Sequence, residues 1–118
     1  MKALAFLALV LLAQPAHADE WTDEDTIAEA AYLALHVIDW GQTRNMALRD
    51  GYYEHNPALG IKPHSDRVNL HFAAGAVLHP LVARALPRPW REGWFTLSII
   101  VEAGIVAGNH RIGLKVDF

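Results

Sequence analysis

The sequence predicts an all-α protein, in which a signal peptide is followed by a three-helix bundle and a short extended C-terminal tail. Three long apolar segments carry residues that begin or end helices, 53% of all residues are hydrophobic, and cysteine is absent. Without disulfides, a domain of about one hundred residues needs an efficient helical core, a metal, an oligomer or a lipid environment to be stable.

The N-terminus has the pattern of a bacterial secretory signal peptide. Lys2 supplies a positive start, residues 3–13 form an apolar run, and residues 16–18 read Ala-His-Ala, a cleavage pattern. The apolar run is too short to span a bilayer comfortably, which disfavours a retained anchor. We therefore predict a signal peptide over residues 1–18 and a single helical domain over 19–118, exported to the inner membrane or the periplasm of a bacterium.

The first helix is predicted over residues 26–48. Thr26 and Glu29 have the Thr-x-x-Glu spacing of a capping box, immediately before an apolar periodic stretch. Gly41 is a weak point within this helix, because glycine is a poor helix former. The polar side chains that share one face of it by helical spacing are Tyr32, His36, Asp39 and Thr43.

Residues 51–65 form a predicted loop, because glycine and proline recur in it at high density. Asn56 precedes Pro57 and is held extended, Gly60 permits a positive φ, and Glu54 can reach a helix N-terminus. Since a turn requires these residue types in any case, they predict a structured turn rather than a binding site.

The second helix is predicted over residues 66–86, with Ser65 as its N-cap and a kink at Pro80. The third is predicted over residues 89–109, where a proline suits the first turn and glycines mark the end. The C-terminal tail that follows alternates between apolar and other residues, as a strand does.

The sequence has features of both a membrane-embedded and a soluble bundle. The apolar segments are shorter than the roughly 18 residues of a clear transmembrane helix. However, nearly every face of the second and third helices is apolar, and tryptophan and tyrosine lie at the segment ends. Gly104 and Gly108 form a small-residue face that lets helices approach closely in lipid. We predict a membrane-embedded bundle with transmembrane helices, and keep a soluble periplasmic helical adaptor as the alternative.

Polar residues inside apolar helices are candidates for a functional site. His36 and Asp39 on the first helix, His79 on the second and Glu102 on the third are ligand types that suit zinc or a similar divalent metal. They predict a metal site between the helices, in a metal-binding protein or a metal-dependent hydrolase. The alternative is a buried hydrogen-bonded network, which is favoured because no motif such as His-Glu-x-x-His is present. No arrangement identifies catalytic residues.

Two short segments carry a resemblance to a known group of proteins. Residues 39–43 read Asp-Trp-Gly-Gln-Thr, and residues 54–60 read Glu-His-Asn-Pro-Ala-Leu-Gly. Together they resemble a pattern in small uncharacterised helical membrane proteins of bacteria and phages. The resemblance covers about half of the mature chain. It implies membrane helices joined by an ordered turn, and it implies no activity.

The composition also restricts the partners of the protein. A formal net charge of -3 and the lack of a basic run exclude nucleic acid, whose binding depends on clustered lysine and arginine. The sequence favours a small envelope protein that acts by helix association rather than by catalysis. Its expected partners are membrane lipid and a second copy of the chain or another membrane protein, contacted through Gly104 and Gly108.

Overall fold

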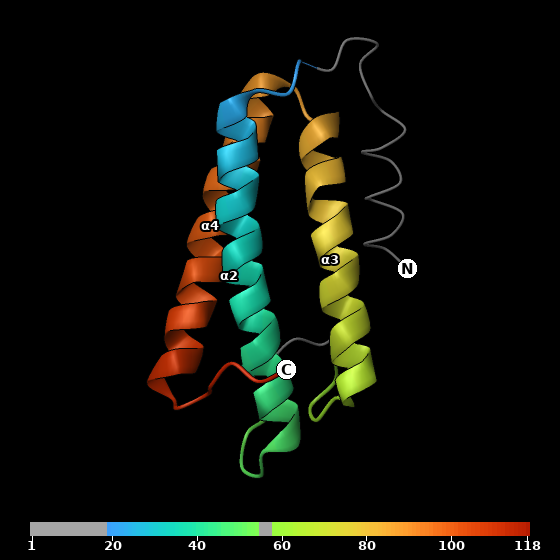
Figure 1. Ribbon diagram of the computed structural model, residues 1–118, viewed down its shortest axis with the longest axis vertical. Helices are drawn as coiled ribbons and strands as arrows, with labels where there is room; N and C mark the ends of the chain where they lie inside the picture. The colour runs from blue at the N-terminus through green and yellow to red at the C-terminus, as the bar shows by residue number, and fades with distance from the viewer. Residues whose placement is uncertain (1–18, 55–57) are drawn as a thin grey trace.

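The computed structural model describes residues 19–54 and 58–118 and contains three α-helices (Figure 1). The helices are α2 (Asp23–Leu48), α3 (Ser65–Ala85) and α4 (Arg88–Arg111). No strand occurs in these residues, so the prediction of an all-α protein with three helices is confirmed. The predicted signal peptide lies outside the described residues, as do Asn56 and Pro57 of the predicted turn.

Helix α2 begins one turn before its predicted start. The Thr22 hydroxyl accepts a hydrogen bond from the backbone N–H of Asp25, whose carboxylate accepts the backbone N–H of Thr22, and the pair forms a capping box. Thr26 already lies in the helix, because its backbone N–H donates to the Thr22 carbonyl at 3.1 Å. The predicted capping box of Thr26 and Glu29 is therefore wrong.

Helices α3 and α4 are joined by a short connection at the closed end of the bundle, where Pro87 caps α4 (Figure 1). Helix α3 begins with His64 as its N-cap rather than the predicted Ser65, and the His64 ring accepts the backbone N–H of Asp66. The helix then continues past Pro80 to its end. The three helices match their predicted ranges to within three residues at each end.

Arg91 ties the three helices together at the closed end. Its side chain is only 1% exposed, and its Nε donates to the Ala83 carbonyl of α3 at 2.8 Å. Its Nη1 donates to one carboxylate oxygen of Asp25 on α2 at 2.9 Å, and Arg88 donates to the other at 2.8 Å. Burial raises the pKa of Asp25, but hydrogen bonds from Thr22 and the two arginines outweigh it, and the pKa lies below its usual 3.8.

Helix α2 lies between α3 and α4 and packs along both, whereas α3 and α4 contact each other little (Figure 1). The C-terminal tail forms no strand and lies along α2, where the Asp117 N–H donates to the Gly41 carbonyl at 3.1 Å. A Cβ atom at Gly41 would lie 2.4 Å from Cγ1 of Val116. The glycine that weakens the helix is therefore what allows the tail to approach it.

The loop before α3 lies at the open end of the bundle, opposite the connection between α3 and α4 (Figure 1). Main-chain contacts fix its conformation. The backbone N–H of Glu54 donates to the Ile61 carbonyl at 2.8 Å, and Gly60 has a φ of 86°. This part of the predicted turn therefore has the expected backbone conformation. Lys62 donates to the Met46 carbonyl at 2.8 Å and so satisfies one of the last carbonyls of α2.

The apolar core is small and lies near the open end. It consists of Leu59, Val68 and Phe72, with Trp40 and Ala47 packed against it. Elsewhere the buried apolar side chains are Met46, Val82, Ala83, Ala85, Phe95 and Leu114. The buried polar side chains are Asp25, Glu29, His36, Asp39, Gln42, Thr43, Asn45, His79, Arg91 and Glu102. Such groups are tolerated in an interior only when hydrogen bonds or ion pairs satisfy them.

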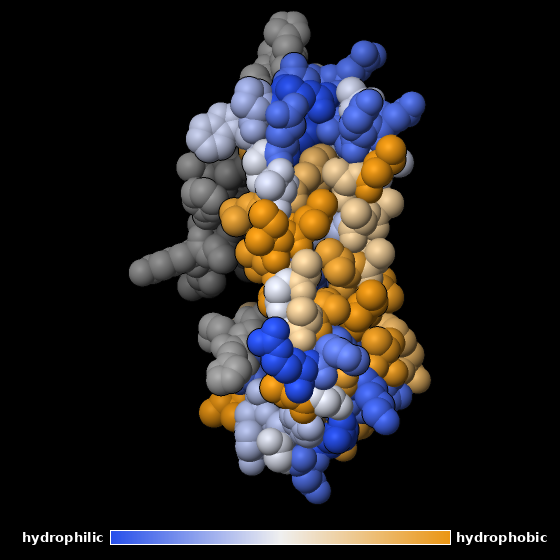
Figure 2. Space-filling model, turned by 90° about the vertical axis from the view of Figure 1, so that its left-hand side faces the viewer, coloured by the Kyte–Doolittle hydropathy of each residue, from blue (hydrophilic) through white to orange (hydrophobic). Residues whose placement is uncertain are grey.

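Large apolar side chains remain exposed on all three helices. On the face drawn in Figure 2, hydrophobic residues cover the middle and mostly hydrophilic residues cover the two ends. Among the described residues, no helix combines the length and the hydropathy needed to cross a membrane, against the prediction of transmembrane helices. Polar side chains recur along each helix and lower its hydropathy.

Candidate functional site

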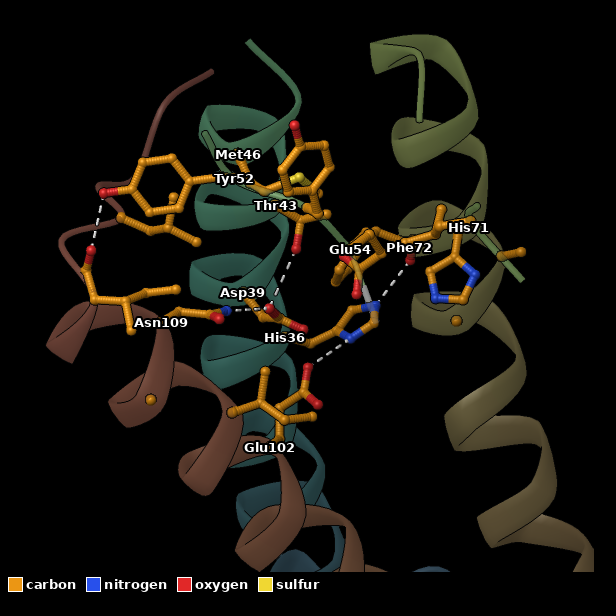
Figure 3. Close-up of a pocket in the computed structure, with 18 of the residues that line it drawn as sticks. His36, Asp39, Thr43, Met46, Tyr52, Glu54, His71, Phe72, Glu102 and Asn109 are labelled. Carbon is orange, nitrogen blue, oxygen red and sulfur yellow. Dashed lines mark hydrogen bonds and ion pairs between the residues drawn. The ribbon is translucent and has the colours of Figure 1, made fainter. Parts of the chain in front are cut away.

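A cleft of about 1220 Å³ lies between α3 and α4, with α2 as its floor (Figure 3). It exists because α3 and α4 each pack on α2 but separate from each other beyond their connection. Its walls include the apolar side chains Met46, Leu59, Phe72, Leu78 and Ile105. The polar residues that line it are Tyr32, His36, Asp39, Thr43, Tyr52, Tyr53, Glu54, His71, Glu102 and Asn109.

The floor of the cleft is the polar face of α2. All four side chains that share this face by sequence spacing, Tyr32, His36, Asp39 and Thr43, line the cleft. Helical periodicity alone was sufficient to group them, since residues three and four positions apart lie on one side of a helix.

His36 links α2 to both neighbouring helices. Its Nδ1 lies 3.1 Å from Oε1 of Glu102 on α4, and its Nε2 lies 2.9 Å from the Phe72 carbonyl oxygen on α3. Both partners are acceptors, so both ring nitrogens donate and the imidazole is charged. Burial lowers the pKa of His36, but the hydrogen bonds to Glu102 and Phe72 and the charges of Glu102 and Asp39 outweigh it and raise the pKa.

Gly75 allows this contact between α2 and α3. A Cβ atom at this position would lie 3.0 Å from both Cε1 and Nε2 of His36. Gly75 is hard to single out from the sequence, because it is one of several small residues in the second helix.

Asp39 is a buried carboxyl group on the cleft floor and is 7% exposed. Its Oδ1 accepts from the Thr43 hydroxyl at 3.3 Å and from Nδ2 of Asn109 at 3.0 Å (Figure 3). Burial raises the pKa of Asp39, as do the charges of Glu102 and Glu54, and the balance places this pKa at about 7. Asp39 therefore exchanges its proton near neutral pH.

Two other titratable groups of the cleft, His71 and Tyr32, also have shifted pKa values. Burial and the nearby charge of His36 lower the pKa of His71, which keeps its imidazole neutral at pH 7. Burial raises the pKa of Tyr32, with contributions from Glu102, Glu29 and Asp39, so its hydroxyl stays protonated. The Tyr32 hydroxyl lies 3.3 Å from Nδ1 of His36.

His79 belongs to a separate cluster. Its Nδ1 lies 2.7 Å from Oε2 of Glu29, the residue that the sequence assigned to a capping box. The Tyr32 ring stacks on His79 with ring centroids 3.5 Å apart and on His36 at 5.3 Å. Tyr32 thus lies between the two histidines.

The four predicted metal ligands are not brought together in the part of the chain that the structure describes. No group of three His, Cys, Asp or Glu side chains there is arranged to hold a metal ion. His36, Asp39 and Glu102 lie in the cleft, but His79 is paired with Glu29. In addition, both nitrogens of His36 have hydrogen-bond acceptors as partners, so metal binding through either nitrogen would require that hydrogen bond to break.

Gly104 and Gly108 are exposed on α4 rather than packed within the bundle. Within the described residues, a Cβ atom added at either position would meet nothing within 4 Å. The close approach expected of these glycines is instead provided by Gly41 and Gly75. Gly108 also lines the cleft.

Glu54 lies at the open end of the cleft, where the sequence predicted only a structured turn. Glu102 and Asn109, seven positions apart on α4, line the opposite wall, as their shared helical face predicts. The site therefore combines one helical face of α2, one of α4 and part of the loop.

No protein-family model, no curated protein and no solved structure matches this chain. The resemblance to small helical membrane proteins of bacteria and phages stays a prediction from the sequence. The function of the chain therefore has to be inferred from the geometry of the cleft.

Proposed function

We propose that this chain is a small exported envelope protein that binds a small molecule in the cleft between α3 and α4. The observation that carries the proposal is the combination of apolar walls with a buried polar floor in a cavity of about 1220 Å³. Small-molecule sites are concave and mostly apolar, with a few converging polar groups that orient the ligand.

The polar groups of the floor favour binding over catalysis. Both nitrogens of His36 are occupied, so this side chain has no lone pair with which to act as a base. Thr43 donates its hydroxyl to Asp39 at 3.3 Å, slightly longer than the usual distance between a nucleophile and its base, and the same carboxylate oxygen also accepts from Asn109. Asp39 can exchange a proton, and in a binding site such a group selects the charge of its ligand.

Blocking the cleft tests the proposal. Ala74 lines the cleft, whereas Ala73 is exposed on α3 and does not line it, so Ala74→Trp and Ala73→Trp are matched variants. We expect the neutral apolar dye N-phenyl-1-naphthylamine to bind to the wild type and to Ala73→Trp, with binding lost in Ala74→Trp. Equal binding by both variants, as measured by dye fluorescence, would overturn the proposal.

A second candidate function, association with membrane lipid, is favoured by the exposed apolar side chains. On α4 these include Leu97 and Ile100, both 64% exposed, and α2 and α3 carry others such as Ile27 and Val77. A single protein partner would cover one face, but apolar side chains on three helices suit lipid, which contacts a protein from several sides. Ligand binding in the cleft and lipid contact outside it are compatible.

Fractionation with N-terminal sequencing of the product tests this second candidate. We expect a chain that begins at Asp19 and sediments with the membranes, as an exported lipid-associated protein should. Gly104→Leu and Gly108→Leu should leave the fold intact, since both positions are open, and Gly104→Leu, which lies outside the cleft, should change only association between chains. A monomeric chain that stays in the supernatant would refute lipid association and favour a soluble periplasmic adaptor.

A further inference from the structure

The cleft contains more acidic than basic groups. Three carboxyl groups line it, those of Asp39, Glu54 and Glu102, and no lysine or arginine does so among the described residues. The charge of His36 is engaged by Glu102 at 3.1 Å. His71, the other basic residue of the cleft, is neutral at pH 7 because burial lowers its pKa. When Asp39 is ionised, its charge therefore has no counter-ion of its own.

The carboxyl group of Asp39 has an acceptor available for a ligand. Both hydrogen bonds to it end on Oδ1, from Thr43 and Asn109, and Oδ2 accepts none from the described residues. The side chain is more than nine-tenths buried, and it lies on the cleft floor between α3 and α4 (Figure 3). Oδ2 is not among the fully buried atoms that lack a partner, so it is accessible from the cleft, and a ligand that brings a donor and a positive charge can form a charge-assisted hydrogen bond with it.

The surroundings of Asp39 suit a positively charged group with an apolar extension. Asp39 is the group that holds the positive charge, since the ring of Tyr32 on the same helix face is already stacked between two histidine rings. Leu78 on α3 and Ile105 on α4 provide apolar surface on the two walls. A fully polar cation would leave this surface in contact with water, and a fully apolar molecule would leave Asp39 without a donor.

We propose that the cleft binds a primary ammonium group carried on an apolar chain, with the ammonium donating to Asp39 and the chain lying between Leu78 and Ile105. The proposal rests on the binding function proposed above and names its ligand class. The cleft should reject carboxylates and phosphates, because the carboxyl groups of Asp39, Glu54 and Glu102 repel anions.

Binding of such a ligand is coupled to release of a proton. The pKa of Asp39 is raised to about 7 by burial and by Glu102 of α4 and Glu54 of the loop, against the effect of His36. His71 of α3, which is neutral, adds no charge at pH 7. An ammonium ion requires the ionised carboxylate, so its affinity should rise with pH through about 7 and level off above it.

Isothermal titration calorimetry with three probes of one chain length tests the proposal: hexylammonium chloride, 1-hexanol and sodium hexanoate. At pH 8 we expect hexylammonium to bind the wild type at least about tenfold more tightly than hexanol, because a hydrogen bond between charged groups is stronger than one from a neutral hydroxyl. Hexanoate should bind most weakly. Asp39→Asn should reduce the affinity for hexylammonium to that for hexanol, and Glu92→Gln, an exposed change on α4 outside the cleft, should leave it unchanged.

The outcomes separate this proposal from the general binding function. If hexanol or hexanoate binds as tightly as hexylammonium and Ala74→Trp abolishes that binding, the cleft is a binding site but the ammonium selectivity is refuted. If no hexyl probe binds while the dye binds in the cleft, only the ligand class is refuted. Should Asp39→Asn fail to fold, the wild type still gives an answer, because hexylammonium binding at pH 7 must release protons. Equal heats in phosphate and Tris buffers would overturn the proposal.

Discussion

The buried carboxyl group of Asp39 should make the folded protein less stable as the pH rises. The side chain is 7% exposed and lies near the carboxylates of Glu102 and Glu54. Burial is the largest cause of its raised pKa, and the hydrogen bond from Thr43 and the charge of His36 only partly oppose it. The variant Asp39→Asn keeps the size of the side chain and removes its titration.

The sign and size of the effect follow from the two pKa values. In the unfolded chain Asp39 ionises near its usual 3.8, and in the folded protein near 7. The folded state therefore binds the proton more tightly. The stability gained from this is complete below pH 3.8 and is lost as the pH rises through about 7. At about 1.4 kcal/mol for each tenfold change in proton affinity, the loss is about 4 kcal/mol.

Urea unfolding of the wild type and Asp39→Asn at several values between about pH 4 and pH 8 measures this effect. The free energy of unfolding of the variant relative to the wild type should increase by about 4 kcal/mol across this range. Asp25 is far from this site and has the same lowered pKa in both proteins, so its contribution cancels in the difference. Asp50→Asn, an exposed change, serves as the control and should show no such trend. A difference between Asp39→Asn and wild type that is independent of pH would refute the reasoning.

Three further predictions follow from single contacts. Arg91→Lys should lower the free energy of unfolding by about 3 kcal/mol, because most of the buried guanidinium donors are lost; a loss below about 1 kcal/mol in urea would contradict this. Gly75→Ala should destabilise by about 1–3 kcal/mol through its contact with His36, whereas Gly104→Ala in open space should stabilise by up to about 1 kcal/mol, both measured by thermal unfolding. Glu102→Gln should lower the pKa of His36, which nitrogen NMR of the imidazole can follow; an unchanged titration would rule out Glu102 as its main partner.

The sequence was sufficient to predict the three helices because their ends are marked by local signals. Pro87 ends one helix and begins the next, and the density of glycine and proline isolates the loop before α3. The observed start of α2 differs from the predicted one because two sequences with the spacing of a capping box follow each other, one beginning at Thr22 and one at Thr26. Tertiary contacts decide which of the two forms the cap. Asp25 of the first sequence pairs with Arg91, whereas Glu29 of the second pairs with His79.

Helical periodicity predicts which residues of the candidate site share a face of one helix, but not how the faces of different helices come together. The spacing on α2 correctly grouped Tyr32 with His36, and the spacing on α4 grouped Glu102 with its neighbours. The position of His79 depends on how α3 lies against α2, which Gly75 and the ring of Tyr32 determine. Sequence periodicity describes one helix at a time, so it carries no information on this alignment.

His36 and Asp39 should have separable roles in the cleft. The charged imidazole of His36 joins Glu102 of α4 to the Phe72 carbonyl of α3, so it holds the two walls at a fixed spacing. Asp39 has its unoccupied oxygen on the floor and determines the charge that the cleft accepts.

Weakening the His36 link by Glu102→Gln should therefore raise the dissociation constants of hexylammonium and hexanol by a similar factor, because both depend on the spacing of the walls. Asp39→Asn should raise only that of hexylammonium. Calorimetry on the two variants compares these factors directly. A loss confined to hexylammonium in Glu102→Gln would show instead that Glu102 binds the ammonium itself and that His36 does not set the width of the cleft.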